Sequence, residues 1–168
     1  MIQSVKPAPT DETDGLPMPK RIWAVISVGF ALCMSVLDVN IINIVLPTLS
    51  HDFGTSPAVT TWIINGYQLA IVVSLLSFSA LGEIIGYRKV YLSGIGLFCI
   101  TSLICALSDS FWTLTIARIF QGFSASAITS VNTAQLRYIY PKSQLGRGMG
   151  INAMVVALSL IHISEPTR

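Results

Sequence analysis

The sequence predicts an all-α membrane protein built from several helices that cross a lipid bilayer. Of its 168 residues, 52% are hydrophobic and only 11% are charged, whereas roughly a quarter of the residues in a soluble domain are charged. Most charged residues lie in short stretches between long apolar runs, which is the pattern that repeated membrane spans produce. We therefore expect four complete spans and the start of a fifth, with the lipid bilayer as a partner.

The chain begins with a polar segment, residues 1–20, that we expect to be a disordered cytoplasmic tail, because its proline-rich and acidic composition cannot bury enough apolar surface to fold. A transmembrane bundle is expected over 21–157. Its complete spans are predicted at about 22–46, 59–81, 90–107 and 111–136, followed by an incomplete span at 148–157. At 1.5 Å per residue these runs suit a hydrocarbon core of about 30 Å. Pro47 and the polar residues after it are expected to end the first span.

The basic residues in the connections predict the orientation of the bundle. Lys and Arg precede the first span, lie between the second and third spans, and follow the fourth, whereas the other two connections have none. Cytoplasmic loops carry an excess of Lys and Arg. We therefore expect a multi-pass protein of the inner (plasma) membrane with a cytoplasmic amino terminus.

Composition and motifs argue against several other classes of protein. The net charge is +2 and no basic run contains interleaved aromatic residues, so no nucleic-acid partner is predicted. The sequence has no nucleophile–base set, metal cluster or phosphate-binding loop, so we expect no enzymatic activity, cofactor or metal. Cys33, Cys99 and Cys105 lie inside apolar segments without the spacing of metal ligands, and we interpret them as small buried hydrophobic residues.

The last residues, 158–168, interrupt the membrane pattern. They place Glu165, Pro166 and Arg168 where a membrane helix should continue. The string LSLIHISEPTR also resembles the in-frame translation of a common transposase sequencing adaptor, so we interpret it as a scar that is not native and exclude it from functional reasoning. The alternative is a native helix end followed by a polar tail.

Two charged residues inside the predicted spans are candidates for function, because a charge at the centre of a span costs at least about 2.5 kcal/mol on insertion scales. Asp38 lies about 12 Å from the outer end of the first span, and Arg118 lies about 10 Å from the same surface on the fourth. At matching depth, the two residues could pair or share a proton pathway. The alternatives are that Arg118 snorkels to the outer interface and that Asp38 caps a shorter first helix.

Polar and small residues accompany both charges. Gln121 and Gly122 follow Arg118 at positions i+3 and i+4, which places the three residues on one helix face. On the first span, Asn40 and Asn43 lie close to the acidic residue, and a surface that faces lipid would not tolerate their amides. We expect both asparagines to face the bundle interior or a cavity.

Several motifs resemble those of the major facilitator superfamily. The string LDVNIINIVLP, which ends in Pro47, is similar to the first-span signature LDxTIVNVALP of fourteen-span drug:proton antiporters, with Asn40 in place of the usual Thr. WIINGYQLA is similar to the start of the second span in the same branch. Arg118, Gln121 and Gly122 match the RxxQG motif of the fourth span.

A fourth motif lies between the second and third spans. SALGEIIGYRKVYL resembles the cytoplasmic motif GxLxDRxGRK of the superfamily and matches it at Gly86, Arg88 and Lys89. It departs at three positions, where Ser, Glu83 and Ile stand for Gly, Asp and Arg. The resemblance implies a cytoplasmic gating loop whose usual charge latch is weakened or rebuilt.

The resemblance covers about residues 21–157 and implies the partial N-terminal helical bundle of a major facilitator fold, in which two six-helix halves rock about a central site. It implies that the full-length parent is a proton-coupled efflux transporter of drugs or other amphipathic small molecules, powered by the proton gradient. Asp38 and Arg118 would serve proton coupling or substrate attraction. The fifth-span motif that separates efflux from uptake would begin where the adaptor-like segment starts. The direction of transport is therefore inferred from the resemblance and is not read from that motif.

Two other functions stay open. The first keeps the fold but makes the cargo a specific metabolite or siderophore, which a narrow substrate preference would favour. The second is a non-transporting membrane scaffold or sensor, for which the polar pair inside the membrane gives no reason. Because four spans cannot supply both halves of an alternating-access pathway, we expect the 168-residue chain alone to be inactive in transport.

The adaptor interpretation can be tested by sequencing. We expect that a library prepared without transposase adaptors, read through the codon for Ala157, continues into a Gly/Pro-rich fifth span and about nine more spans, as a fourteen-span transporter requires. A stop codon directly after LSLIHISEPTR would contradict this interpretation.

Overall fold

The computed structural model describes residues 15–140, 144–146, 148–150, 153–154 and 157. In this part of the chain the helices are α1 (Met18–Asp52), α2 (Pro57–Thr60), α3 (Trp62–Ile85), α4 (Tyr87–Ala106) and α5 (Phe111–Ile139), and the described residues contain no strand. The predicted all-α class is thus confirmed. Residues 1–14 of the predicted tail, all of 158–168, and part of the incomplete span at 148–157 lie outside the described residues.

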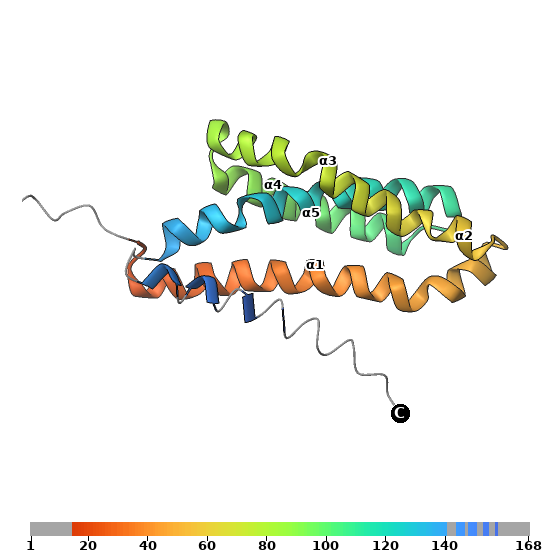
Figure 1. The fold of residues 1–168 in the computed structure, drawn as a ribbon, viewed down its shortest axis with the longest axis horizontal. Coiled ribbons are helices and arrows are strands. Elements are labelled where there is room, and N and C mark those ends of the chain that lie inside the picture. Colours follow the sequence, from red (N-terminus) through yellow and green to blue (C-terminus); the bar gives the residue numbers. More distant parts are fainter. Residues whose placement is uncertain (1–14, 141–143, 147, 151–152, 155–156, 158–168) are drawn as a thin grey trace, which may run out of the picture.

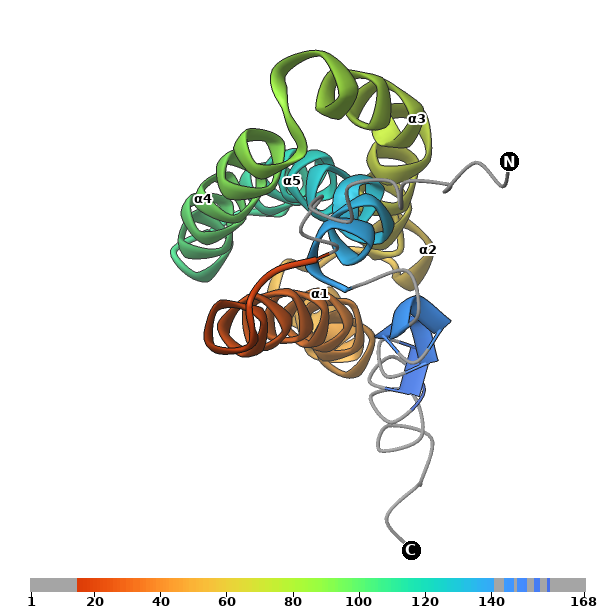
Figure 2. The ribbon, with the colours of Figure 1, turned by 90° about the vertical axis from the view of Figure 1, so that its left-hand side faces the viewer.

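Helix α5 lies at the centre of the bundle. Viewed along the bundle, α3, α4 and α1 surround it, and α1 lies alongside as a long separate rod (Figures 1 and 2). Three segments are long and apolar enough to cross a membrane by length and composition: Pro19–Asp52, Pro57–Ile85 and Tyr87–Ala106. Helix α5, the predicted fourth span, is less apolar because it buries several polar residues, namely Arg118, Gln121, Ser124, Ser126 and Asn132. Because α5 lies at the centre of the bundle, these polar side chains are covered by the neighbouring helices.

Small residues allow α5 to approach its neighbours closely. A Cβ atom added at Gly122 would lie 2.5 Å from the carbonyl oxygen of Tyr67 and 2.9 Å from the Cβ of Ala70, both on α3. On α4, a Cβ atom added at Gly94 would lie 3.1 Å from the Cβ of Ala127. Close backbone approach through small residues is a common way for membrane helices to associate. The α3–α5–α4 group is therefore tightly packed.

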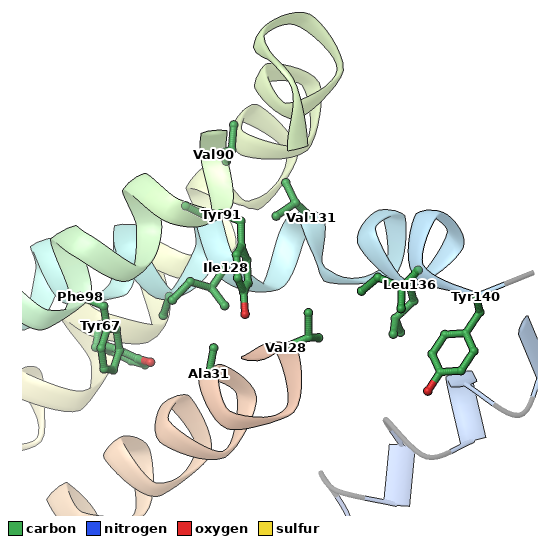
Figure 3. Packing of buried hydrophobic residues seen from close by; sticks show 13 residues of the cluster. Val28, Ala31, Tyr67, Val90, Tyr91, Phe98, Ile128, Val131, Leu136 and Tyr140 are labelled. Atoms are coloured by element: carbon green, nitrogen blue, oxygen red, sulfur yellow. The ribbon is translucent and has the colours of Figure 1, made fainter. Parts of the chain in front are cut away.

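Helix α1 contacts this group through an apolar layer and through polar groups. Val28 and Ala31 point toward Ile128 of α5 and toward Tyr91 of α4 (Figure 3). The Tyr91 hydroxyl donates a hydrogen bond to the carbonyl oxygen of Ser27, at 3.2 Å. This contact links α1 to α4 near the end of the bundle where α1 begins.

The first helix is longer than the sequence predicted. It begins at Met18, inside the predicted tail, with Pro17 as the N-cap and Pro19 in the first turn, where the N–H that a proline lacks has no helical partner. It also continues through Pro47, where the sequence predicted a helix end, because helices in a membrane tolerate an internal proline.

The residue that ends α1 is Gly54, which has a positive φ of 59°. The N–H of Gly54 donates to the carbonyl of His51, and the N–H of Thr55 donates to the carbonyl of Ser50. These two bonds form a Schellman motif, which satisfies the last carbonyls of the helix. The termination signal was therefore a glycine with a left-handed backbone, and the earlier proline misled the sequence prediction.

The predicted charged loop between the second and third spans is a junction of one residue. Glu83 lies in the last turn of α3, and Arg88 and Lys89 lie in the first turn of α4. Gly86 alone separates the helices, and its φ of 98° requires a residue without a Cβ. The junction is therefore rigid, and its charged residues are held by helices.

We expect Gly122→Ala to destabilise the protein by about 1–3 kcal/mol, because the added methyl group would meet the α3 backbone and force the helices apart. Thermal unfolding of the full-length protein in detergent would measure the loss. Gly96→Ala is the matched control, since a Cβ atom at Gly96 meets nothing within 4 Å. Equal stability of the two variants would show that α5 does not need the close approach.

Candidate functional site

Asp38 and Arg118 form an ion pair between α1 and α5. The Nη1 atom of Arg118 donates to Oδ2 of Asp38 at 2.7 Å, and Nε2 of Gln121 donates to Oδ1 of the same carboxylate at 3.1 Å. The side chains of Arg118 and Asp38 are 8% and 14% exposed. The structure thus brings three residues that the sequence singled out to one point, where both carboxylate oxygens accept a hydrogen bond.

The helices position these groups without local distortion. Asp38 lies well inside α1, far from both of its ends, so it does not cap a shorter helix. Arg118 is buried and its guanidinium points to Asp38, so it does not snorkel to an interface. The spacing of three residues between Arg118 and Gln121 presents both donors to α1 on one face of α5. Both alternatives considered from the sequence are therefore wrong for this structure.

Residues from α3 and α4 complete the surroundings of the pair. The Sγ atom of Cys105 donates to Oε1 of Gln121 at 3.5 Å. Tyr67 of α3 is buried and lies within electrostatic range of both Asp38 and Arg118. All four long helices therefore contribute a polar side chain to one region of the bundle.

Sequence reasoning missed two of these residues. Cys105 was interpreted as a small buried hydrophobic residue, yet it is a hydrogen-bond donor, and Cys99 is exposed. Tyr67 lies in the quoted string WIINGYQLA, and its polar hydroxyl in an apolar span was an available signal. The pairing of Cys105 with Gln121 has no local signal, because it depends on how α4 packs against α5.

The remaining motif residues of α1 take no part in the hydrogen bonds described for the pair. Asn40 is half-buried and donates from Nδ2 to the carbonyl of Val36, one turn earlier in its own helix, at 2.6 Å. Asn43 and Pro47 are exposed. Asn43 is therefore not packed among the described helices, and the expectation that both asparagines face the bundle interior or a cavity stays a prediction.

The guanidinium of Arg118 has a buried donor that is not satisfied within the described residues. Its Nε atom is buried and has no hydrogen-bond partner among the described residues. A buried guanidinium with a single carboxylate partner is sensitive to the charge of that partner, because its charge and its donors have few other ways to be satisfied. The stability of the buried guanidinium therefore depends on the charge of Asp38.

The predicted gating residues lie at the other end of the bundle, where α1 begins. Glu83, Gly86 and Arg88 line a cavity of about 700 Å³ between α1, α4 and the ends of α3 and α5. Lys89 is exposed and is not among the lining residues. Within the described residues, no ion pair joins Glu83 to Arg88 or Lys89.

The family model of the Major Facilitator Superfamily matches residues 28–162 of the chain. The match covers most of the sequence, from within α1 to beyond the end of α5. The chain belongs to the major facilitator superfamily. The matched range continues to residue 162, past the boundary at 157 where the sequence predicted the native part to end.

Several relatives in this superfamily are transporters. The chain is 51% identical over 151 residues to the uncharacterized transporter YebQ of Escherichia coli, covering 90% of this chain and 33% of YebQ. It is 31% identical over 140 residues to the riboflavin transporter RibZ of Clostridioides difficile, covering 83% and 31%. It is 30% identical over 140 residues to the drug efflux pump JefA of Mycobacterium tuberculosis, covering 83% and 28%. The chain therefore spans about a third of the length of these relatives.

Membership of the superfamily indicates that the helices lie in a membrane. The chain is part of a multi-pass membrane protein of a transporter family, and the apolar outer surfaces of α1, α3 and α4 are those of membrane-spanning helices. The Asp38–Arg118 pair thus lies inside a transporter bundle, where an ionisable residue is expected to have a function.

The strength of the pair can be measured with a double-mutant cycle. We expect Asp38→Asn alone and Arg118→Gln alone each to destabilise the full-length protein by about 3–5 kcal/mol, because each leaves one charge or its donors buried without a partner. The double variant should recover much of that loss. Thermal unfolding in detergent would measure all four proteins. Strictly additive effects would indicate that the two residues do not interact.

Proposed function

We propose that the full-length protein is a proton-driven exporter of amphipathic small molecules, in which Asp38 binds the transported proton and Arg118 is its partner. The observation that carries this proposal is the buried ion pair between α1 and α5. A carboxylate inside a membrane bundle is stable when it is paired, and when it is unpaired it tends to take up a proton. Asp38 is therefore suited to alternate between these two states.

The geometry links protonation to helix movement. When Asp38 is ionised, its carboxylate holds α1 to α5 through Arg118 and Gln121. When Asp38 is protonated, its attraction to Arg118 falls, and α1 can separate from the tightly packed α3–α5–α4 group. A ligand that binds preferentially when the pair is closed and Asp38 is ionised would lower the affinity for the proton, and proton binding would in turn weaken the binding of the ligand, because coupling between two sites is reciprocal. This mutual opposition is the basis of exchange between a proton and a substrate.

The direction of transport and the membrane setting belong to the same proposal. The name of JefA describes a drug efflux pump, and the motif LDVNIINIVLP is similar to that of fourteen-span drug:proton antiporters. The first supports export, and the second supports a fourteen-span protein that exchanges drugs for protons. The distribution of basic residues supports an orientation with the amino terminus in the cytoplasm, and we propose the inner membrane as the location.

A second candidate is a transporter for a specific metabolite. It is favoured by the similarity to RibZ, whose name describes a riboflavin transporter. A panel of drugs and metabolites tested with the same full-length protein would separate the two candidates, since a drug exporter accepts several chemically unrelated compounds and a metabolite transporter accepts one narrow class.

The role of Asp38 can be tested directly. In proteoliposomes with an imposed pH gradient, we expect Asp38→Asn to reduce proton-driven transport by at least about tenfold, because an amide cannot take up and release a proton. Asp52→Asn is the matched control, since Asp52 is at the end of α1 and its side chain is 62% exposed. Proton-driven transport by Asp38→Asn at the rate of the control would remove Asp38 from the mechanism.

A further inference from the structure

The amide of Gln121 connects Asp38 on one side to Cys105 on the other. Its Nε2 atom donates to Oδ1 of Asp38 at 3.1 Å, and its Oε1 atom accepts from Sγ of Cys105 at 3.5 Å. The Gln121 residue is fully buried, with an exposed fraction of 0%. No water-accessible surface is therefore available to satisfy either end of the amide.

The orientation of this amide determines what Asp38 meets. An ionised carboxylate can only accept hydrogen bonds, so it needs the NH2 end of Gln121. If the amide turned over, its carbonyl oxygen would face the carboxylate and repel the ionised form, while a protonated carboxyl group could donate to it. The two orientations thus favour opposite protonation states of Asp38.

The thiol of Cys105 stabilises the orientation that the structure shows, in which Sγ donates to the carbonyl oxygen of the amide. A thiol is a weak donor and a weak acceptor, and here it supplies the donor for the carbonyl oxygen of Gln121. Without this donor, Oε1 would be a buried acceptor with no partner, which is unfavourable. We infer that Cys105 is a positioning residue that orients the Gln121 amide and thereby favours the ionised, Arg118-paired state of Asp38.

This inference deepens the proposed function and rests on it for its relevance to transport. The titratable and charged groups near Asp38 come from each helix around it: Arg118 from α5, Tyr67 from α3 and Cys105 from α4. Arg118 supplies the charge that pairs with Asp38. Cys105 acts only through Gln121, so its removal should change the balance between protonation states while leaving the ion pair able to form.

The test follows the protonation of Asp38 itself. In the full-length protein reconstituted in lipid, infrared difference spectra recorded across a pH series would show the C=O stretching band of the protonated carboxyl group, assigned to Asp38 by its loss in Asp38→Asn. We expect Cys105→Ala to move the midpoint of this titration upward by about 0.5 pH unit, because one weak hydrogen bond that favours the ionised form is lost.

Two further variants make the result specific. Cys105→Ser keeps a donor at this position and should return the midpoint to that of the unmodified protein. Cys99→Ala removes an exposed cysteine of the same helix and should leave the midpoint unchanged. An unchanged midpoint in Cys105→Ala, or an equal shift in Cys105→Ser, would overturn the inference.

The readout separates this inference from the proposed function. A shift in Cys105→Ala together with full proton-driven transport by Asp38→Asn would support the positioning role and remove the transport role of Asp38. Loss of transport in Asp38→Asn with no shift in Cys105→Ala would support the transport role of Asp38 and remove the positioning role of Cys105.

Discussion

The contact between Asp38 of α1 and Arg118 of α5 is the interaction on which the arrangement of α1 depends. Helices α3, α4 and α5 associate through close backbone approach at small residues, whereas α1 is joined to them by an apolar layer and a few polar links. In an apolar solvent, contacts between apolar surfaces give little driving force for helix association, because lipid chains are equally apolar. Polar links therefore have a large share in holding α1 in place.

These links lie along the length of α1. The Asp38 pair is in its middle, the hydrogen bond from Tyr91 to the carbonyl of Ser27 is nearer its start, and the N–H of Leu16, just before the helix, donates to the carbonyl of Ile139 on α5. The latter two links are between neutral groups, and their strength does not depend on the charge of Asp38. The strength of the Asp38–Arg118 pair does depend on the charge of Asp38. Protonation would therefore change the α1–α5 contact at this pair, while the other two links keep α1 attached.

The misplaced boundaries of α1 show how sequence signals compete. Proline and glycine both indicate helix ends, but they act through different groups: a proline removes one donor, while a glycine allows the left-handed turn that satisfies the final carbonyls. At Pro47 the remaining hydrogen bonds carried the helix onward, and at Gly54 the Schellman motif ended it. The charged motif around Gly86 was likewise predicted as a loop, because the sequence does not reveal that one glycine suffices to reverse the chain.

The sequence by itself determined the all-α class, the approximate positions of the long helices, and the choice of Asp38, Arg118 and Gln121 as unusual residues. These features follow from composition and from the period of the helix, which are local properties. Only the tertiary structure decided that the three side chains meet, that Asn43 is exposed, and that Cys105 and Tyr67 join the site. The reason is physical: the helix period sets the face on which a residue lies, but the rotation and depth of each helix against its neighbours are set by packing between segments far apart in the chain.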